Sequence, residues 1–165
     1  MAQRAMSPNV VTVRISRKAL KPLQQGHPWF FREGRIDAPV GAVARLVDGD
    51  RAVAWGLVDD GPIAVRVLGR GEPPRASLEQ VVGERIRRAD GVRTRLLGPG
   101  TDAYRVIAGA GDGLPGVVVD RYGPLVVLRL YGACWEPFQD ELAQALKGLP
   151  DVDHVARRLG VRRVD

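Results

Sequence analysis

Hydrophobic and polar residues alternate near the start of the chain, as they do in strands with one buried face. The stretch NVVTVRIS at 9–16 places three apolar residues on one side and three polar residues on the other. The basic stretch 17–24 predicts a short helical turn that ends before Gly26 and Pro28. Between 43 and 70, three apolar runs are separated by the turns DGD and DDGP, which predicts a β-meander. The first seventy residues are therefore expected to form a small, mostly β barrel or curled sheet.

A linker and a long helix follow this region. GRGEPPRAS at 69–77 combines Gly, Pro and charge without periodicity, and Ser77 and Gln80 then match the capping box of a helix. The helix has an apolar stripe, and its other faces carry arginines that either form a solvated face or face RNA. These arginines are Arg85, Arg87, Arg88, Arg93 and Arg95.

The second half of the chain predicts strands at 104–107, 117–120 and 125–132 and an amphipathic helix at 136–147. A further strand is expected to begin within 151–157. The patterns together predict an α+β protein with two small domains, 9–72 and 77–165. The second domain is expected to be truncated at its C-terminus.

The charge indicates a polyanionic partner. The net charge is +6 and the pI is about 10.2, and almost all basic residues are arginine, which binds phosphate through a planar fork and stacks on bases. An arginine-rich proteome encoded by a GC-rich genome explains the same composition. The apolar runs are far shorter than the roughly 20 residues of a membrane span, and no signal peptide is evident. A soluble cytoplasmic protein without a membrane partner is expected, and its oligomeric state is not indicated.

No catalytic, metal-binding or cofactor-binding site is predicted within these residues. A single cysteine, Cys134, excludes an internal disulfide and is expected to be a small buried hydrophobic residue. His154 has no partner ligands elsewhere in the sequence. The loop GAGDGLPG at 109–116 joins strand to strand, so it lacks the helix N-terminus of a nucleotide-binding loop. We expect a tight turn, with glycines at positive φ and Asp112 as its cap.

The stretch QGHPWFFREG at 25–34 concentrates aromatic residues in a chain where they make up only 5%. An extended conformation would place Trp29 and Phe31 on one side and the residues that alternate with them on the other. One or two of the rings are expected to fill the core. Gly26 within the stretch would permit close approach of an RNA backbone, and nearby cations would bind phosphates. The predicted RNA-binding residues are Arg17, Lys18, Lys21, Gly26, His27 and Arg32.

Three segments together resemble a known family: RKALKPLQQGHPWFFREGRI (17–36), IAVRVLGRGE (63–72) and YRVIAGAGDGLPGVVVDRYG (104–123). They are similar to the N-terminal part of bacterial class I SAM-dependent rRNA (cytosine-C5) methyltransferases of the large ribosomal subunit. The resemblance implies a PUA-like RNA-binding barrel at 9–72 and a small α/β domain of helix–β-hairpin–helix order. Ala108 and Ala110 depart from the family, which usually has polar residues there.

The family's catalytic domain has a Rossmann fold, which is expected to be absent from this chain. Neither its glycine-rich SAM loop nor the Pro-Cys motif of its nucleophile occurs in the sequence, and Cys134 lies in a different context. The chain alone is therefore expected to be inactive and to hold no cofactor, although the full-length family uses S-adenosylmethionine. The expected role is to position 23S rRNA for a 5-methylcytosine methyltransferase domain. The alternatives are a stand-alone PUA-type RNA-binding or ribosome-assembly module, and a small enzyme that uses the 109–116 loop.

Overall fold

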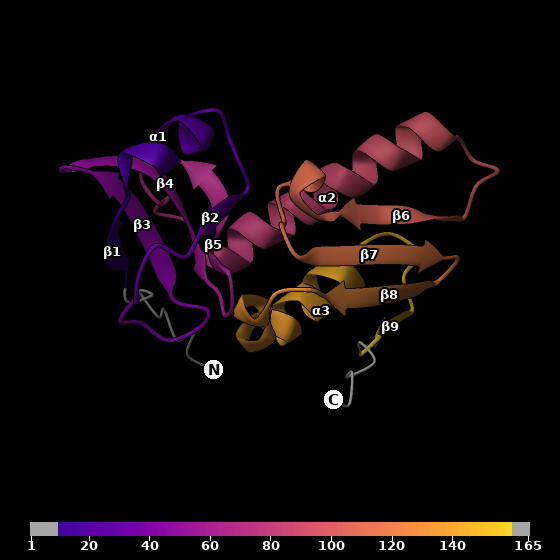
Figure 1. Cartoon of the computed structure of the whole chain (residues 1–165). Helices are drawn as coiled ribbons and strands as arrows, with labels where there is room; N and C mark the ends of the chain where they lie inside the picture. Colours follow the sequence, from indigo (N-terminus) through magenta and orange to yellow (C-terminus); the bar gives the residue numbers. More distant parts are fainter. Residues whose placement is uncertain (1–9, 160–165) are drawn as a thin grey trace. The chain divides into compact units, whose positions relative to one another are not determined.

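The structure, a computed structural model, describes residues 10–159 (Figure 1). It divides into two compact units, each with its own sheet. The first unit runs to Leu78 and also includes Gly132–Pro137, and the second consists of Glu79–Tyr131 and the chain from Phe138 onward. The predicted α+β class is confirmed. Within residues 10–159, no helix has the length and apolarity needed to cross a membrane.

The first unit is built on a five-stranded sheet in the order β1-β3-β4-β5-β2. β1 pairs with β3 in parallel, and the other neighbours are antiparallel. The predicted meander is confirmed, with Gly49 and Gly61 at positive φ in its two Asp-Gly turns. No pairing among the described strands joins β1 to β2, so the sheet does not close into a barrel through its ladders. The strands are β1 (Val11–Arg14), β2 (Trp29–Phe31), β3 (Val43–Asp48), β4 (Arg51–Val58) and β5 (Ile63–Arg70).

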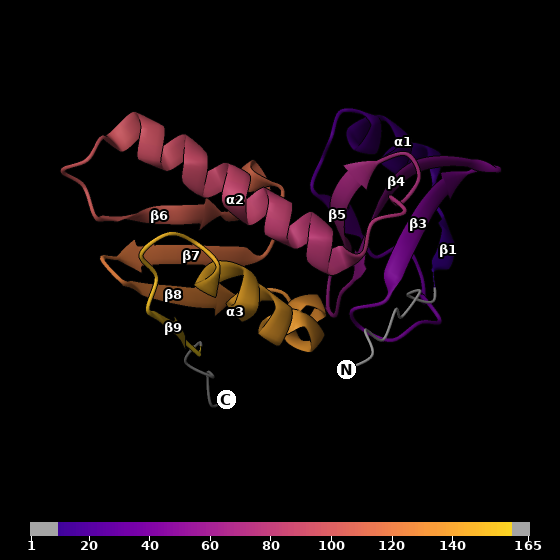
Figure 2. The same cartoon turned by 180° about the vertical axis from the view of Figure 1, so that it is seen from behind.

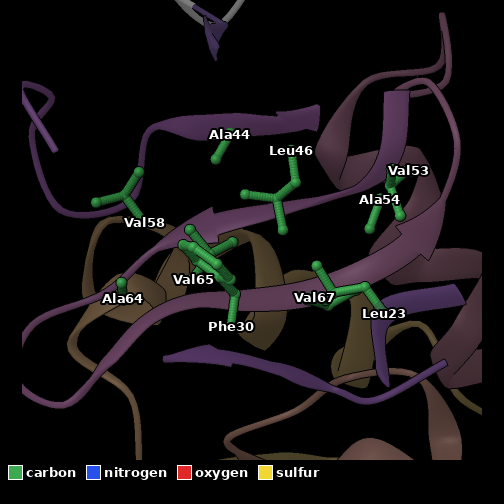
Figure 3. Close-up of a cluster of buried hydrophobic side chains, with 10 residues drawn as sticks. All are labelled: Leu23, Phe30, Ala44, Leu46, Val53, Ala54, Val58, Ala64, Val65 and Val67. Carbon is green, nitrogen blue, oxygen red and sulfur yellow. The ribbon is translucent and has the colours of Figure 1, made fainter. Parts of the chain in front are cut away.

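Helix α1 (Arg17–Gln24) and the edge strand β2 each place one deeply buried side chain in the core of this unit. Leu23 of α1 is 1% exposed and Phe30 of β2 is 3% exposed, and both belong to the cluster of buried side chains in Figure 3. The other members come from the meander, including Leu46 and Val65. This core fixes the helix and the aromatic strand, which together carry the candidate site.

The segment Gly132–Pro137 reaches the first unit from far along the sequence. It forms most of the 3-10 helix η2 (Ala133–Phe138), and the buried Asp59 carboxylate accepts a 2.9 Å hydrogen bond from the Cys134 backbone N–H. The prediction of one helix over 136–147 was wrong at its start, because α3 begins only at Gln139. Pro137 lacks a backbone N–H and disfavours α-helical geometry in the residue before it, which explains the later start.

The second unit has a four-stranded sheet in the order β6-β7-β8-β9, with β8 and β9 parallel. Both helices cover the same face of this sheet (Figures 1 and 2). The order is helix, three antiparallel strands, helix and strand, so helix–hairpin–helix describes it only coarsely. The elements are α2 (Leu78–Leu97), β6 (Ala103–Ala108), β7 (Val117–Tyr122), β8 (Leu125–Leu130), α3 (Gln139–Lys147) and β9 (His154–Arg157).

The side chain of Asp112 stabilises the glycine-rich loop of the second unit. Its carboxylate accepts a 2.7 Å hydrogen bond from the Ala108 N–H, which confirms the predicted turn cap. The same carboxylate accepts hydrogen bonds from the two terminal nitrogens of Arg93, at 2.5 and 2.7 Å. Arg85 donates to the Gly113 carbonyl at 2.5 Å. Two of the five arginines of α2 therefore bind the loop instead of forming a solvated face. These contacts order the loop although residues 108 and 110 are alanines.

Candidate nucleic-acid interface

Helix α1 carries three exposed cations, Arg17, Lys18 and Lys21. Arg17 and Lys21 are four residues apart, so they share a face of the helix, and Lys18 lies beside them. Within residues 10–159, none of the three side chains makes a hydrogen bond or an ion pair. Their charges are therefore available to an external polyanion.

The positions of Arg17 and Lys18 oppose the helix dipole. The first turn of α1 contains no acidic residue, and cations there are unfavourable by roughly 0.3–1 kcal/mol each. The carboxylate at this end belongs to Glu33, which accepts hydrogen bonds from the Ser16 N–H at 3.0 Å and the Ser16 hydroxyl at 2.5 Å. Helix stability therefore does not account for the two cations.

Gly26 has a structural role at the end of α1. Its φ of +88° is the left-handed geometry that ends helices, and the His27 N–H returns to the Pro22 carbonyl at 3.0 Å. A Cβ on Gly26 would lie 2.8 Å from Nη2 of Arg70, so the Arg70 guanidinium occupies the space that a side chain at position 26 would need. Arg70 is exposed and adds a fourth cation beside α1. Sequence reasoning missed it because only the pairing of β5 with β2 brings it there.

The aromatic residues of β2 alternate as predicted. Phe30 is buried in the core, whereas Trp29 is 40% exposed and Phe31 is 53% exposed. His27, Trp29 and Phe31 form what we call the aromatic cluster, with ring centroids 5.8 to 6.3 Å apart. The imidazole Nδ1 lies 2.9 Å from the Trp29 carbonyl oxygen, which fixes the His27 ring against the start of β2.

The aromatic cluster and the basic helix border one hollow of about 240 Å³. Lys18 and Pro22 line it from α1, and all three rings of the cluster line it from the other side. Glu33 also contributes to the lining, with its carboxylate held at Ser16. Charged and aromatic side chains from two different elements, α1 and β2 with its preceding residues, therefore meet at one place.

Arg32 lies at the end of β2, but its donors serve the fold. Its Nε donates to the Gly61 carbonyl at 2.8 Å and its Nη2 to the Asp59 carbonyl at 3.0 Å. These bonds hold the turn between β4 and β5. Because these hydrogen bonds lie within the fold, Arg32 is not among the phosphate-binding residues proposed below.

Cys134 has the environment of a structural cysteine. Its side chain is fully buried, and burial together with the nearby Asp59 carboxylate raises the pKa of the thiol far above its ordinary value. A thiol that stays protonated is a poor nucleophile. Within residues 10–159, no three histidine, cysteine or acidic side chains converge as a metal site would require.

Residues 13–70 match the family described as a PUA-like domain, which confirms that part of the expectation. The "Ribosomal RNA large subunit methyltransferase" of Deinococcus radiodurans is 36% identical over 148 residues, which cover 83% of this chain and 36% of that protein. The "Ribosomal RNA large subunit methyltransferase I" of Alteromonas mediterranea is 42% identical over 149 residues, 86% of this chain and 37% of that protein.

A solved structure shares the fold. A putative SAM-dependent methyltransferase from Streptococcus mutans superposes with a TM-score of 0.71 at 20% identity, covering 83% of this chain and 37% of that chain. A putative methyltransferase complexed with SAH matches equally well. The chain spans little more than a third of the length of the relatives it matches. It contains a PUA-like domain and has homologues named rRNA large-subunit methyltransferases.

Proposed function

We propose that this chain is the RNA-binding part of a SAM-dependent methyltransferase that acts on large-subunit rRNA. More specifically, residues 9–72 bind 23S rRNA and residues 77–165 form a central domain. Together they position the RNA for 5-methylcytosine formation. The methyl transfer itself is assigned to residues outside this chain. The observation that carries the proposal is the set of cations on α1, in the PUA-like unit, that have no partner among residues 10–159.

The glycine-rich loop at 109–116 does not fit S-adenosylmethionine. The loop at 109–116 leads into strand β7 rather than into a helix N-terminus, and the Asp112 carboxylate is already held by Arg93 and the Ala108 N–H. We therefore derive no catalytic step within this chain. Its contribution is binding and orientation of RNA.

The binding mode that α1 supports is contact with phosphates. Each cation that neutralises a phosphate releases condensed counterions, so affinity falls as salt rises. Phosphate contacts position RNA without reading its sequence. We accordingly expect salt-dependent binding to ribosomal RNA fragments with little sequence preference from Arg17, Lys18 and Lys21, to which Arg70 adds a further charge.

The double variant Lys18→Ala/Lys21→Ala tests this role. Loss of two phosphate contacts is expected to weaken binding by a similar factor for all RNA sequences. The slope of log affinity against log salt should fall in magnitude by about 1.4–1.8. Fluorescence anisotropy with labelled rRNA fragments across a salt series measures both quantities.

The matched control is Arg87→Ala/Arg88→Ala, which removes two exposed cations from α2. It changes the net charge by the same amount and should leave affinity and slope close to those of the unmodified chain. Equal losses for the two double variants would mean that binding follows net charge and not a surface on α1. Absence of any salt-dependent RNA binding by the unmodified chain would overturn the proposed function.

Arg17→Ala is expected to separate binding from folding. Removing a first-turn cation relieves its conflict with the helix dipole, so the free energy of unfolding should stay unchanged or rise by a few tenths of a kcal/mol. RNA affinity should nevertheless fall. Urea denaturation and anisotropy on the same preparation compare the two. A parallel loss of stability and affinity would show that Arg17 acts on the fold.

A stand-alone RNA-binding or ribosome-assembly module is the second candidate. It is favoured by the placement of every proposed RNA contact in the first unit, where binding needs no catalytic partner. The two candidates differ in the reading frame of the gene beyond Asp165. A continuing frame with a glycine-rich SAM loop and a Pro-Cys motif supports the methyltransferase.

A further inference from the structure

We propose that the aromatic cluster is a stacking site for an unpaired RNA base, beside the phosphate-binding helix. The inference rests on the proposed function and adds the class of RNA: a single-stranded or flipped-out nucleotide instead of a regular duplex. Bases within a duplex keep their faces stacked on their neighbours, whereas unpaired bases are free to stack on aromatic side chains.

The rings are held at the surface by the strand that carries them. Phe30, between Trp29 and Phe31, is anchored in the core, so its two neighbours project to the opposite side. Backbone pairing of Trp29 with Arg66 fixes this part of β2 on β5. A rigid aromatic platform loses little conformational entropy when a base settles on it.

The geometry of the rings suits one flat ligand. Trp29 stands nearly perpendicular to both other rings, at 80° to His27 and 81° to Phe31. A base stacked on one ring face would meet the neighbouring ring at an edge, an arrangement that aromatic groups favour. Within residues 10–159, His27 Nε2 makes no hydrogen bond, so it can bond to the edge of the base.

The charged rim favours a nucleotide over a protein partner. Protein-binding patches are depleted of charged residues at their centre. Here Lys18 lines the same hollow as the rings, and α1 carries two more cations, Arg17 before it and Lys21 after it. A base on the rings with its phosphate near Lys18 satisfies both features together. The Glu33 carboxylate in the lining keeps its negative charge, but it is one charge against the three cations of α1, and its hydrogen bonds hold it at Ser16.

The full chain provides a direct optical test. Of its three tryptophans, Trp29 is 40% exposed, whereas Trp55 is 6% exposed and Trp135 is fully buried. A base that stacks on Trp29 should quench the tryptophan emission. The probes are a mixed-sequence single-stranded RNA, the same strand annealed to its complement, and an abasic ribose-phosphate strand of equal length. Quenching is expected with the first probe and should be much weaker with the other two.

Variants then measure what the rings contribute. Trp29→Ala and Phe31→Ala should each weaken single-strand binding by about 5- to 150-fold, with affinity for the duplex nearly unchanged. Trp29→Phe keeps a stacking face and should recover most of the affinity. Circular dichroism and thermal unfolding check that each variant is folded, and both positions are exposed enough to tolerate the change.

The outcomes separate the two proposals. Salt-dependent RNA binding with no quenching, and with unchanged affinity in Trp29→Ala and Phe31→Ala, overturns the stacking site while leaving the proposed function in place. Equal losses for single-stranded, abasic and duplex RNA also overturn it, because the rings would then act without contacting a base. Lack of binding to every probe at low salt overturns the proposed function itself.

Discussion

Replacing Asp59 with alanine is expected to lower the free energy of unfolding of the first unit by about 3–5 kcal/mol. The carboxylate is 2% exposed and accepts hydrogen bonds from Arg66 Nε at 2.5 Å, the Cys134 N–H at 2.9 Å and the Asp60 N–H at 2.9 Å. Without this carboxylate, the buried Arg66 guanidinium loses its ion pair with Asp59, and the Cys134 N–H in the interior loses its acceptor. Such groups are costly to desolvate when their partner is lost.

Asp60→Ala is the matched control for this prediction. Asp60 is the next residue and also carries a carboxylate, but it is exposed and accepts a 2.8 Å bond from the Gly61 N–H within the turn. Its loss should cost about 0.5–1 kcal/mol, the usual worth of a local hydrogen bond. Asp59→Asn should fall between the two alanine variants, because it keeps an acceptor and removes the charge. Urea denaturation followed by circular dichroism measures all three.

Equal effects of Asp59→Ala and Asp60→Ala would show that the buried ion pair contributes little to stability. A loss confined to Asp59→Ala would identify this carboxylate as the attachment point of the Gly132–Pro137 segment in the first unit. The segment brings Trp135, which is fully buried, so near-ultraviolet circular dichroism should also report its release.

Asp59 shows where sequence reasoning reached its limit. As part of DDGP, it was interpreted as an ordinary turn residue, and the β-hairpin that this pattern predicts is present. Its contact with Cys134 joins residues 75 positions apart, and neither local propensity nor periodicity carries information over that distance. Turns and alternation are local properties of the chain, whereas a buried ion pair depends on which segments meet in the fold.

The same distinction applies to the candidate site. Its local patterns could be predicted from the sequence, whereas its tertiary contacts could not. The alternation in WFF correctly placed Trp29 and Phe31 on one side, but it could not tell which side faces the core. The cations of α1 were predicted as one group because they lie within five residues of each other in the sequence. The position of Arg70 beside Gly26 could not be predicted because β-sheet pairing creates it, and the bonds of Arg32 to the β4–β5 turn could not be predicted because they are tertiary contacts.

Gly56→Ala is expected to destabilise the first unit by about 3 kcal/mol or more, above the usual range for overpacking. A Cβ there would lie 2.0 Å from the Arg66 carbonyl oxygen, 2.7 Å from its carbonyl carbon and 2.9 Å from the Val67 Cα. All three atoms belong to the β5 backbone, which cannot turn aside as a flexible side chain does. Relief requires β4 and β5 to separate at the irregularity where the register shifts.

Gly34→Ala is the control, since a Cβ at Gly34 meets nothing within 4 Å and the residue has no positive φ. That substitution should leave stability unchanged or raise it by about 0.4–1 kcal/mol through the unfolded chain. The Gly56→Ala effect should extend to RNA binding, because β5 also pairs with Trp29 and supports the aromatic cluster. Single-strand affinity of the folded fraction should therefore fall in Gly56→Ala and stay constant in Gly34→Ala. If Gly56→Ala unfolds at the same urea concentration as the unmodified chain, β4 and β5 do not approach as closely as the structure indicates.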